Sequence, residues 1–320
     1  MNAPLPDPES VARFRADLAA LTGPAPGLLG VAVSGGPDSL ALLLLACAAF
    51  PGAVRAATVD HRLRPENAAE AAFVGDVCAG LGIPHATLVG DDAIAGNLQS
   101  AARALRYRLL ADWAEAAGVA CLLTAHHRDD QAETLLMRLQ RGAGLAGLAG
   151  IRARTAINGL KVARPLLGWP RAALSALVEA AGLEAVQDPS NADERYDRAR
   201  LRRRLAETGW IDPAPLARSA EALAEADAAL DWTVEQLIGE RAEAAAGGLS
   251  FDAQGVPAEL RRRILLRLLA LLAPADPPRG DAVQRLLATL DAGGTATLAR
   301  VKCEGGPVWR LAPEPPRREP

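Results

Sequence analysis

The amino-acid sequence predicts an α/β protein: a doubly wound, mostly parallel sheet followed by a smaller, mainly helical C-terminal domain. Short apolar runs of strand length alternate with longer runs of helical periodicity through the first half of the chain, as in repeated β-α-β units. Apolar residues make up 50% of the 320 residues and aromatic residues only 3%, which suits helices packed on short strands. Two closely spaced prolines, Pro213 and Pro215, then introduce a helical remainder.

The first domain is expected to cover residues 1–211. A strand–helix–strand connection within one sheet makes its strands parallel. The predicted strands cover residues 28–33, 54–59, 85–89, 120–125 and 157–163. The predicted helices cover residues 40–50, 66–81, 97–117, 129–141 and 169–181. In such sheets ligands bind beyond the carboxyl ends of the strands, so polar residues at those ends are candidate site residues.

The second domain is expected to cover residues 212–320. Its helical periodicity predicts helices at residues 215–246, 257–272 and 281–290. Residues 295–303 and 308–311 have strand character, and the Glu-Gly-Gly-Pro between them predicts a hairpin. The last residues, rich in Pro, Arg and Glu, predict a disordered tail.

Cysteine usage and hydropathy bear on the cellular compartment. The four cysteines are far apart and form no C-x-x-C pair, which argues against zinc or iron–sulfur binding and against a disulfide framework. The longest apolar stretch, residues 40–50, is too short to cross a bilayer, and the N-terminus lacks the pattern of a signal peptide. We therefore expect reduced thiols, no membrane partner and a cytoplasmic protein.

A glycine-rich segment between the first predicted strand and the following helix is the strongest chemical signal. It reads Ser34-Gly35-Gly36-Pro37-Asp38-Ser39. At such a junction main-chain N–H groups and the positive end of the helix dipole converge on an anion, and glycines let a phosphate approach closely. The segment lacks both the ending of a Walker loop and the glycine spacing of a dinucleotide fold. The alternative is an ordinary turn in which Asp38 or Ser39 only caps the helix.

Polar residues also follow two further predicted strands. They are the pairs Asp60-His61 and His126-His127. A helix that starts after the second pair would carry acids and a histidine, spaced by three or four, on one face toward the loop: His126, Asp129, Asp130 and Glu133. The alternative is an acidic first turn that complements the helix dipole. It accounts for the two aspartates but not for the histidines.

The formal net charge of -3 argues mildly against a nucleic-acid partner, but basic residues are clustered. Residues 138–171 contain no Asp or Glu, and residues 198–204 are rich in arginine, so both segments are candidates for contact with a nucleic-acid backbone. Three arginines in these clusters are candidate substrate contacts: Arg141, Arg202 and Arg203. Arg103 and Arg106 fit a phosphate contact and a solvated helix face equally well. The glycine-rich residues 142–150 predict a mobile cover or a plain linker.

The S-G-G-x-D-S signature of the loop resembles the pyrophosphate loop of the N-type ATP pyrophosphatase family. Further segments resemble, in the same order, those of the tRNA(Ile)-lysidine synthetase family. They are residues 59–64, 101–107, 125–134, 141–145, 164–167 and 188–191. The resemblance implies that the loop binds ATP, that Asp38 holds Mg²⁺ against the departing pyrophosphate, and that Ser34 and Ser39 donate hydrogen bonds to it.

The candidate site residues fall into three groups. The catalytic candidates are Asp38, His126, Asp130 and Glu133. The ATP-binding candidates are the loop residues together with Asp60 and His61. The substrate-binding candidates are Arg103, Arg106, Asp129, Glu133, Arg141, Arg202 and Arg203. Whether Asp129 or Glu133 binds lysine or the metal is left open by the sequence.

The resemblance implies a defined reaction. The enzyme would adenylate the C2 carbonyl oxygen of the wobble cytidine in isoleucine tRNA with a CAU anticodon, and the ε-amine of free lysine would displace AMP to give lysidine. A homodimer is compatible with the resemblance. Longer family members carry an extra C-terminal domain, which we expect this chain to lack.

Two other functions compete with this interpretation. A related enzyme that thiolates tRNA would use the same loop but needs paired or clustered reactive cysteines, which the sequence lacks. A noncatalytic ATP-binding module would need the loop but neither the acidic face at residues 126–133 nor the basic segments.

Overall fold

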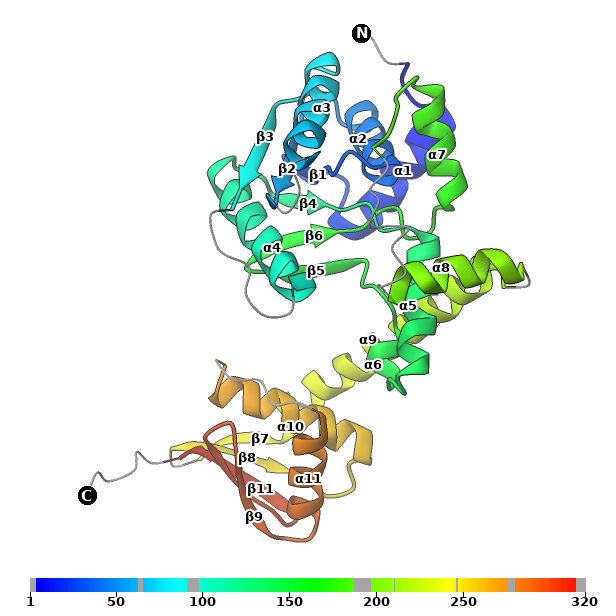
Figure 1. The fold of residues 1–320 in the computed structure, drawn as a ribbon. Helices are drawn as coiled ribbons and strands as arrows, with labels where there is room; N and C mark the ends of the chain where they lie inside the picture. Colours follow the sequence, from blue (N-terminus) through cyan, green and yellow to red (C-terminus); the bar gives the residue numbers. More distant parts are fainter. Residues whose placement is uncertain are drawn as a thin grey trace. The chain divides into compact units, whose positions relative to one another are not determined.

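The computed structural model describes residues 4–62, 66–90, 98–186, 197–209, 211–245, 247–274 and 280–314. They belong to two compact units, Met1–Ala224 and Glu225–Pro320 (Figure 1). The division lies within helix α9 (Pro213–Arg241), which begins just after the expected boundary at 211/212. Proline is favoured in the first turn of a helix, where its missing N–H costs nothing, and Pro213 accordingly starts a helix.

A six-stranded sheet with the order β3-β2-β1-β4-β6-β5 forms the centre of the first unit. Its strands are β1 (Leu29–Ala32), β2 (Val54–Asp60), β3 (His85–Val89), β4 (Cys121–Leu123), β5 (Arg154–Ile157) and β6 (Leu160–Ala163). Neighbouring strands are parallel except β5 and β6, which form an antiparallel hairpin at one edge. The predicted doubly wound, mostly parallel sheet is confirmed, and β5 is an additional strand.

Helices cover both faces of this sheet (Figure 1). They are α1 (Pro8–Thr22), α2 (Pro37–Ala49), α3 (Glu66–Gly80), α4 (Leu98–Ala116), α5 (Arg128–Gln140), α6 (Leu145–Leu148), α7 (Arg171–Ala180) and α8 (Asp197–Thr208). Residues 40–46 of α2 are fully buried, because this helix is apolar on all sides and packs against β1, α1 and α7. Helices α1, α6 and α8 lie outside the predicted elements.

Strands β1 and β4 pair with each other at the point where the strand order reverses. From β1 the chain continues to β2 on one side of this pair, and from β4 it continues to β5 and β6 on the other side. In open α/β sheets such a switch point leaves a crevice at the carboxyl ends of the strands. The segment after β1 is the glycine-rich loop, and the segment after β4 is the His126-His127 pair. The topology therefore brings the two motifs to one crevice.

The second unit contains a sheet as well as helices. Its antiparallel strands have the order β7-β8-β11-β10-β9, namely β7 (Ala242–Ala245), β8 (Gly248–Asp252), β9 (Thr295–Leu298), β10 (Val301–Glu304) and β11 (Val308–Pro313). Its helices are the end of α9, α10 (Ala258–Leu272) and α11 (Gly280–Asp291). The predicted hairpin is present as β10 and β11.

Two expectations for the second unit need correction. The helix expected at residues 215–246 ends at Arg241, and β7 follows it. The strand expected at residues 295–303 is divided by Ala299 and Arg300, whose φ angles of 50° and 59° turn the chain between β9 and β10.

Some predicted features lie outside the described residues. They are the expected tail at 315–320, residues 63–64 and 188–191 of the sequence motifs, and residue 97 at the start of a predicted helix. None of the described helices combines the length and apolar composition that a bilayer crossing requires.

A buried charge cluster links α9 and α10 within the second unit. Arg263 is only 7% exposed and donates through Nη2 to Asp227 Oδ1 at 2.6 Å, through Nη1 to Asp231 Oδ1 at 2.7 Å and through Nε to Glu259 Oε1 at 2.8 Å. These acids raise the pKa of the guanidinium even though burial lowers it. Because a buried guanidinium needs several acceptors, this network fixes which faces of the two helices meet.

We expect Asp227→Ala to lower the free energy of unfolding by about 3 kcal/mol, the lower end for breaking a buried ion pair, because two acids remain beside Arg263. The matched control is Glu235→Ala, whose partner Arg267 is exposed, and it should cost less than about 1 kcal/mol. Urea denaturation of both variants measures the difference. Equal losses would show that burial of Asp227 adds nothing to its contact with Arg263.

Candidate functional site

The glycine-rich loop is closed by its own side chains. Ser39 Oγ donates to Gly36 O at 2.9 Å and accepts from Ser34 N–H at 3.1 Å, and the two serine Oγ atoms lie 3.3 Å apart. Gly35 has a φ of 83° and accepts at its carbonyl from Val186 N–H at 2.9 Å. These contacts close the loop, and its conformation depends on a left-handed residue at position 35.

Helix α2 begins in the loop without a side-chain cap. Gly36 is its N-cap and Pro37 its first residue, and neither Asp38 nor Ser39 accepts a capping hydrogen bond there. The alternative of an ordinary capped turn is therefore not what the structure contains. Uncapped N–H groups at a helix N-terminus form a site for an anion such as a phosphate.

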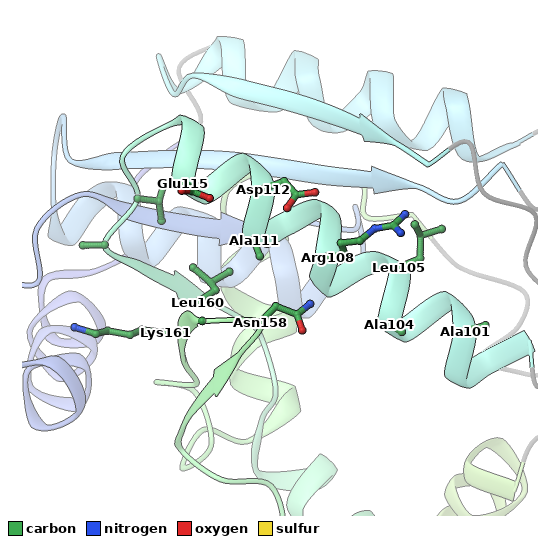
Figure 2. Close-up of a pocket in the computed structure, with 13 residues that line it drawn as sticks. Ala101, Ala104, Leu105, Arg108, Ala111, Asp112, Glu115, Asn158, Leu160 and Lys161 are labelled. Atoms are coloured by element: carbon green, nitrogen blue, oxygen red, sulfur yellow. The ribbon is translucent and has the colours of Figure 1, made fainter. Parts of the chain in front are cut away.

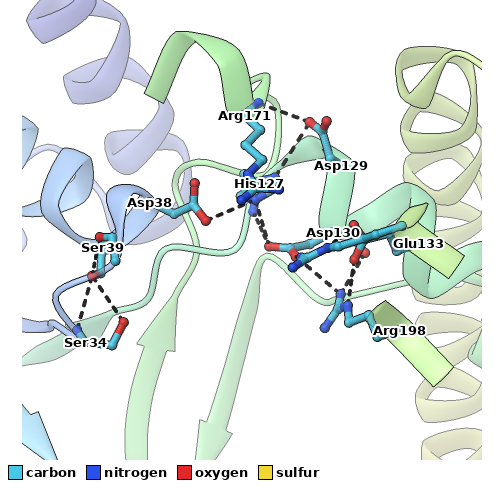
Figure 3. A network of polar contacts seen from close by, with 11 residues as sticks. Ser34, Asp38, Ser39, His127, Asp129, Asp130, Glu133, Arg171 and Arg198 are labelled. Atoms are coloured by element: carbon cyan, nitrogen blue, oxygen red, sulfur yellow. Dashed lines mark hydrogen bonds and ion pairs between the residues drawn. The ribbon is translucent and has the colours of Figure 1, made fainter. Parts of the chain in front are cut away.

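Asp38 points from the first turn of α2 toward the start of α5 (Figure 3). Its Oδ2 lies 3.4 Å from His127 Nε2. Its Oδ1 is buried and accepts no hydrogen bond from the residues that the structure describes. A buried carboxylate oxygen without a donor is costly unless a cation or another donor reaches it, so this atom is an open ligand position.

His127 is the residue that joins the acids of the site. Its ring is 1% exposed, with Nε2 3.5 Å from Asp130 Oδ2 and Nδ1 3.7 Å from Asp129 Oδ2, in addition to the contact with Asp38. Burial lowers the pKa of His127, but Asp129, Asp38 and Asp130 outweigh it and raise the pKa to about 9. The ring is therefore an imidazolium at neutral pH.

The neighbouring His126, unlike His127, is uncharged at neutral pH. Burial lowers its pKa to about 4, although Asp130 acts against this shift. Its Nδ1 lies 3.1 Å from Thr124 Oγ1, and it is therefore a neutral ring at neutral pH. From the sequence His126 was a catalytic candidate, and His127 was placed beside it at the strand end without a role of its own. The structure puts His127 at the N-cap of α5, against Asp38 of α2.

Asp130 and Glu133 of α5 meet two arginines of α8 (Figure 3). Glu133, 4% exposed, accepts from Arg198 Nε at 2.7 Å and from Arg202 Nε at 2.6 Å. Arg202 Nη2 also donates to Asp130 Oδ1 at 3.1 Å. Burial lowers the pKa of Arg202, and the bond to Glu133 raises it more. Arg202, expected to contact a nucleic acid, is bound to these acids within the protein. Arg198 was expected only as a member of the basic segment 198–204 and not as a separate site residue.

The end of β2 supplies a second polar group at the same edge of the sheet. Asp60 Oδ1 accepts from Arg62 N–H at 2.8 Å. His61 Nε2 lies 3.3 Å from both Nε and Nη2 of Arg106, and burial lowers the pKa of His61. Arg103 stacks on Tyr107 instead, with its guanidinium carbon 5.0 Å from the ring centroid. The structure thus joins His61 to Arg106, and the charge of Arg103 adds to burial in lowering the pKa of His126.

Most described arginines of the basic segments bond to the protein itself. Arg138 Nη1 donates to the carbonyls of Gly147 and Gly150 at 2.6 and 2.8 Å, and Arg164 Nη1 donates to Arg152 O at 2.7 Å. Arg141 pairs with Asp197 at 3.1 Å and Arg203 with Glu207 at 2.7 Å. Residues 142–150 contain the short helix α6, and Arg138 bonds to two of their carbonyls.

A cavity of about 1000 Å³ lies elsewhere in the first unit, between α4 and the β5–β6 turn (Figure 2). Its lining combines small apolar side chains of α4 with charged groups. The charged and amide residues are Arg108, Asp112, Glu115, Asn158 and Lys161. None of the candidate site residues lines it, so its size does not make it the candidate active site.

Comparison with known proteins gives concordant results. A family model described as a PP-loop domain matches residues 12–208. The tRNA(Ile)-lysidine synthase of Novosphingobium aromaticivorans is 49% identical over 313 residues, which cover 97% of this chain and 95% of that protein. The tRNA(Ile)-lysidine synthase of Zymomonas mobilis is 43% identical, covering 93% of this chain and 92% of that one.

Among solved structures, the U34-tRNA thiolase NcsA from Methanococcus maripaludis is similar in fold. It has a TM-score of 0.55 and 19% sequence identity, and the match covers 68% of this chain and 78% of that one. At this identity the likeness concerns the fold alone.

We expect Gly35→Ala to lower the free energy of unfolding by about 1–2 kcal/mol, because a Cβ is strained at a φ of 83° and would lie 3.1 Å from Val186 Cγ2. Gly36→Ala is the matched control. Its φ is -73° and the nearest atom to a new Cβ is Ser34 Oγ at 3.8 Å, so stability should barely change. Urea denaturation without nucleotide compares them, and equal stabilities would contradict the strain argument.

Proposed function

The chain belongs to the tRNA(Ile)-lysidine synthase family of PP-loop proteins, and from this premise we propose how its residues carry out ATP-dependent lysidine formation on tRNA(Ile). In this reaction the C2 carbonyl oxygen of the wobble cytidine attacks the α-phosphorus of ATP, and pyrophosphate leaves. The ε-amine of lysine then attacks C2 of the adenylated base, loses a proton and displaces AMP. The enzyme must therefore hold ATP, a cytidine and a free amino acid in one crevice.

The observation that carries the proposal is that Asp38 lies in the first turn of α2, whose N-terminus has no side-chain cap. The N–H groups of the loop and the first turn of α2 would hold the β- and γ-phosphates, as in other phosphate sites at helix N-termini. Ser34 and Ser39 would exchange their mutual contact for bonds to pyrophosphate oxygens. The uncharged His126 follows β4 and the Asp60-His61 pair ends β2, the strands on either side of β1, and the remainder of ATP would bind between them.

The residues present fit a magnesium ion. Asp38 Oδ1 is buried and has no donor in the described part of the chain, and Mg²⁺ is commonly bound by one or two carboxylates together with substrate phosphates and water. No cluster of three or more His, Cys, Asp or Glu in the described ranges is arranged as a metal cage, which agrees with an ion that arrives with ATP. Bound there, the ion would neutralise charge that develops on the departing pyrophosphate.

Acids and cations alternate in the site. Four carboxylates, on Asp38, Asp129, Asp130 and Glu133, contact three cations, on His127, Arg198 and Arg202. Burial raises the pKa of the Asp129 carboxyl group, but contacts that include His127 and Arg128 outweigh burial and lower it. His127 spreads positive charge along the acids next to the loop, where pyrophosphate charge would be stabilised.

Lysine is proposed to bind at the cluster of Asp130, Glu133, Arg198 and Arg202. Its carboxylates attract the ammonium groups of lysine, and its guanidinium groups attract the lysine carboxylate. Both oxygens of Glu133 accept hydrogen bonds from arginine, so Glu133 would hold these arginines in place. Both oxygens of Asp130 also accept, from His127 N–H and Arg202 Nη2, but its side chain is the more exposed of the two, 11% against 5%, and would offer a further lone pair to an ammonium group. The ε-ammonium must lose a proton before it attacks, and Asp130, in hydrogen-bond reach of that nitrogen in this arrangement, would accept it.

The tRNA partner follows from the family, and its contacts are proposed to include exposed arginines such as Arg171. The homodimer and the cytoplasmic location stay predictions. The thiolation alternative is further weakened by the cysteines: all four are free, and burial raises the pKa of Cys78 to about 12 and that of Cys303 to about 11. Thiols of this kind are poor sulfur carriers.

We expect the wild-type protein to incorporate labelled lysine into CAU-anticodon tRNA(Ile) with release of pyrophosphate. Asp38→Asn should reduce the rate of pyrophosphate release about a hundredfold, because a neutral amide is a poor Mg²⁺ ligand. The matched control is Asp112→Asn, an exposed acid on α4. A wild-type protein that binds ATP without modifying tRNA would contradict the proposed reaction, and near-normal release by Asp38→Asn would contradict the metal role.

Glu133→Gln should raise the KM for lysine about tenfold and leave the KM for ATP within about twofold, because it frees Arg198 and Arg202 to neutralise Asp130. Asp38→Asn should show the reverse pattern. Steady-state kinetics with lysine and ATP varied separately measure both. An unchanged lysine dependence together with weaker ATP or Mg²⁺ use would assign Glu133 to the metal site.

A further inference from the structure

The turn at residues 168–171, between β6 and α7, is held by the N-terminal helix α1. Trp169 is 2% exposed, and its Nε1–H donates to Asp17 Oδ2 at 2.8 Å. The guanidinium carbon of Arg13 lies 4.3 Å from the centroid of the Trp169 ring, and Arg13 Nη2 donates to Gly168 O at 3.0 Å. Three contacts of different kinds thus fix this turn to one face of α1.

The other side of the same turn holds the start of α5. Trp169 O accepts from Arg128 N–H at 3.0 Å, and Arg171 N–H donates to Asp129 Oδ2 at 3.1 Å. N–H groups in the first turn of a helix have no partner within the helix, so each of these bonds satisfies a donor at the N-terminus of α5 or α7. The turn therefore ties the two N-termini together.

From Asp129 the contacts continue to the phosphate loop (Figure 3). Asp129 Oδ2 lies 3.7 Å from His127 Nδ1, and His127 Nε2 lies 3.4 Å from Asp38 Oδ2. Asp129 Oδ2 thus faces both the main chain of the turn and the imidazolium. A shift of the turn would move Asp129, and through it the ring that faces Asp38.

We propose that Trp169 is a positioning residue for the transfer of the adenylyl group, a role that rests on the proposed function. Its buried indole, anchored on Asp17, sets the position of the turn, and the turn sets the position of Asp129 and His127 beside Asp38. Trp169 itself does not reach the loop. Small displacements of groups that align phosphates reduce rates strongly, which makes such an indirect role measurable.

The first variant is Trp169→Phe, which removes the Nε1 donor and keeps an aromatic ring beneath Arg13. We expect kcat for pyrophosphate release to fall about tenfold, with the KM for lysine unchanged. Asp17→Ala should have the same effect. Asp17→Asn keeps an oxygen that accepts from the indole, and it should restore near wild-type kinetics.

A control separates positioning from general loosening of α1. Arg15 lies on the same helix and donates to Ala49 O at 2.9 and 2.7 Å, a contact that holds α1 on α2 and does not involve the turn. Arg15→Ala should lower stability in urea without changing kcat of the folded protein. A loss of kcat equal to that of Trp169→Phe would overturn the assignment, since it would make any loosening of α1 sufficient.

A double-mutant cycle tests whether Trp169 acts through Asp129. Asp129→Ala alone should reduce kcat, and adding Trp169→Phe should reduce it no further. Additive losses, or a folded Trp169→Phe protein with wild-type kcat, would overturn the proposal.

Binding of ATP with Mg²⁺, measured by calorimetry without tRNA or lysine, keeps this test separate from the reaction itself. Weaker binding by Trp169→Phe and Asp17→Ala but not by Asp17→Asn would support the positioning role even in a protein that made no lysidine. Equal binding by all three variants, together with wild-type kcat, would overturn it.

Discussion

His127 lies at the N-terminus of α5 with its imidazole buried between Asp38, Asp129 and Asp130. These acids keep the ring charged at neutral pH although burial opposes the charge. A buried cation is stable only where anions surround it, so the ring requires the first turn of α2, which carries Asp38, to lie beside the first turn of α5. The strand order brings the phosphate loop and the acids after β4 to one crevice, and the contacts of His127 join them there.

Two helix N-termini in one crevice give the site its mixed character. The uncapped start of α2 favours anions, whereas the carboxylates beside it favour cations. A nucleoside triphosphate with its divalent cation matches both preferences, and so does an amino acid with two ammonium groups and a carboxylate. Asp38 Oδ1, which is buried and accepts from none of the described residues, lies between the start of α2 and these carboxylates.

Many arginines of this protein form hydrogen bonds that connect different segments of the chain. Arg138 and Arg164 donate to main-chain carbonyls of the segment after α5, and Arg198 and Arg202 bind the acids of α5. The same device recurs in the second unit, where Arg263 binds three carboxylates. A guanidinium offers five donors in a fixed plane, so one side chain can join several acceptors from different segments.

The sequence by itself determined the alternation of strands and helices in the first unit, the phosphate loop, and the acids after β4, because periodicity and turn chemistry depend on near neighbours. It did not determine the charge of His127, the hydrogen bonds from Arg198 and Arg202 to Glu133, or the hydrogen bond from Trp169 to Asp17. In each case the partners come from segments far apart in the chain, 65 residues for Arg198 and Glu133 and 152 for Trp169 and Asp17. Only tertiary packing decides such contacts, because the burial and the fields that set protonation and pairing do not exist before the segments meet.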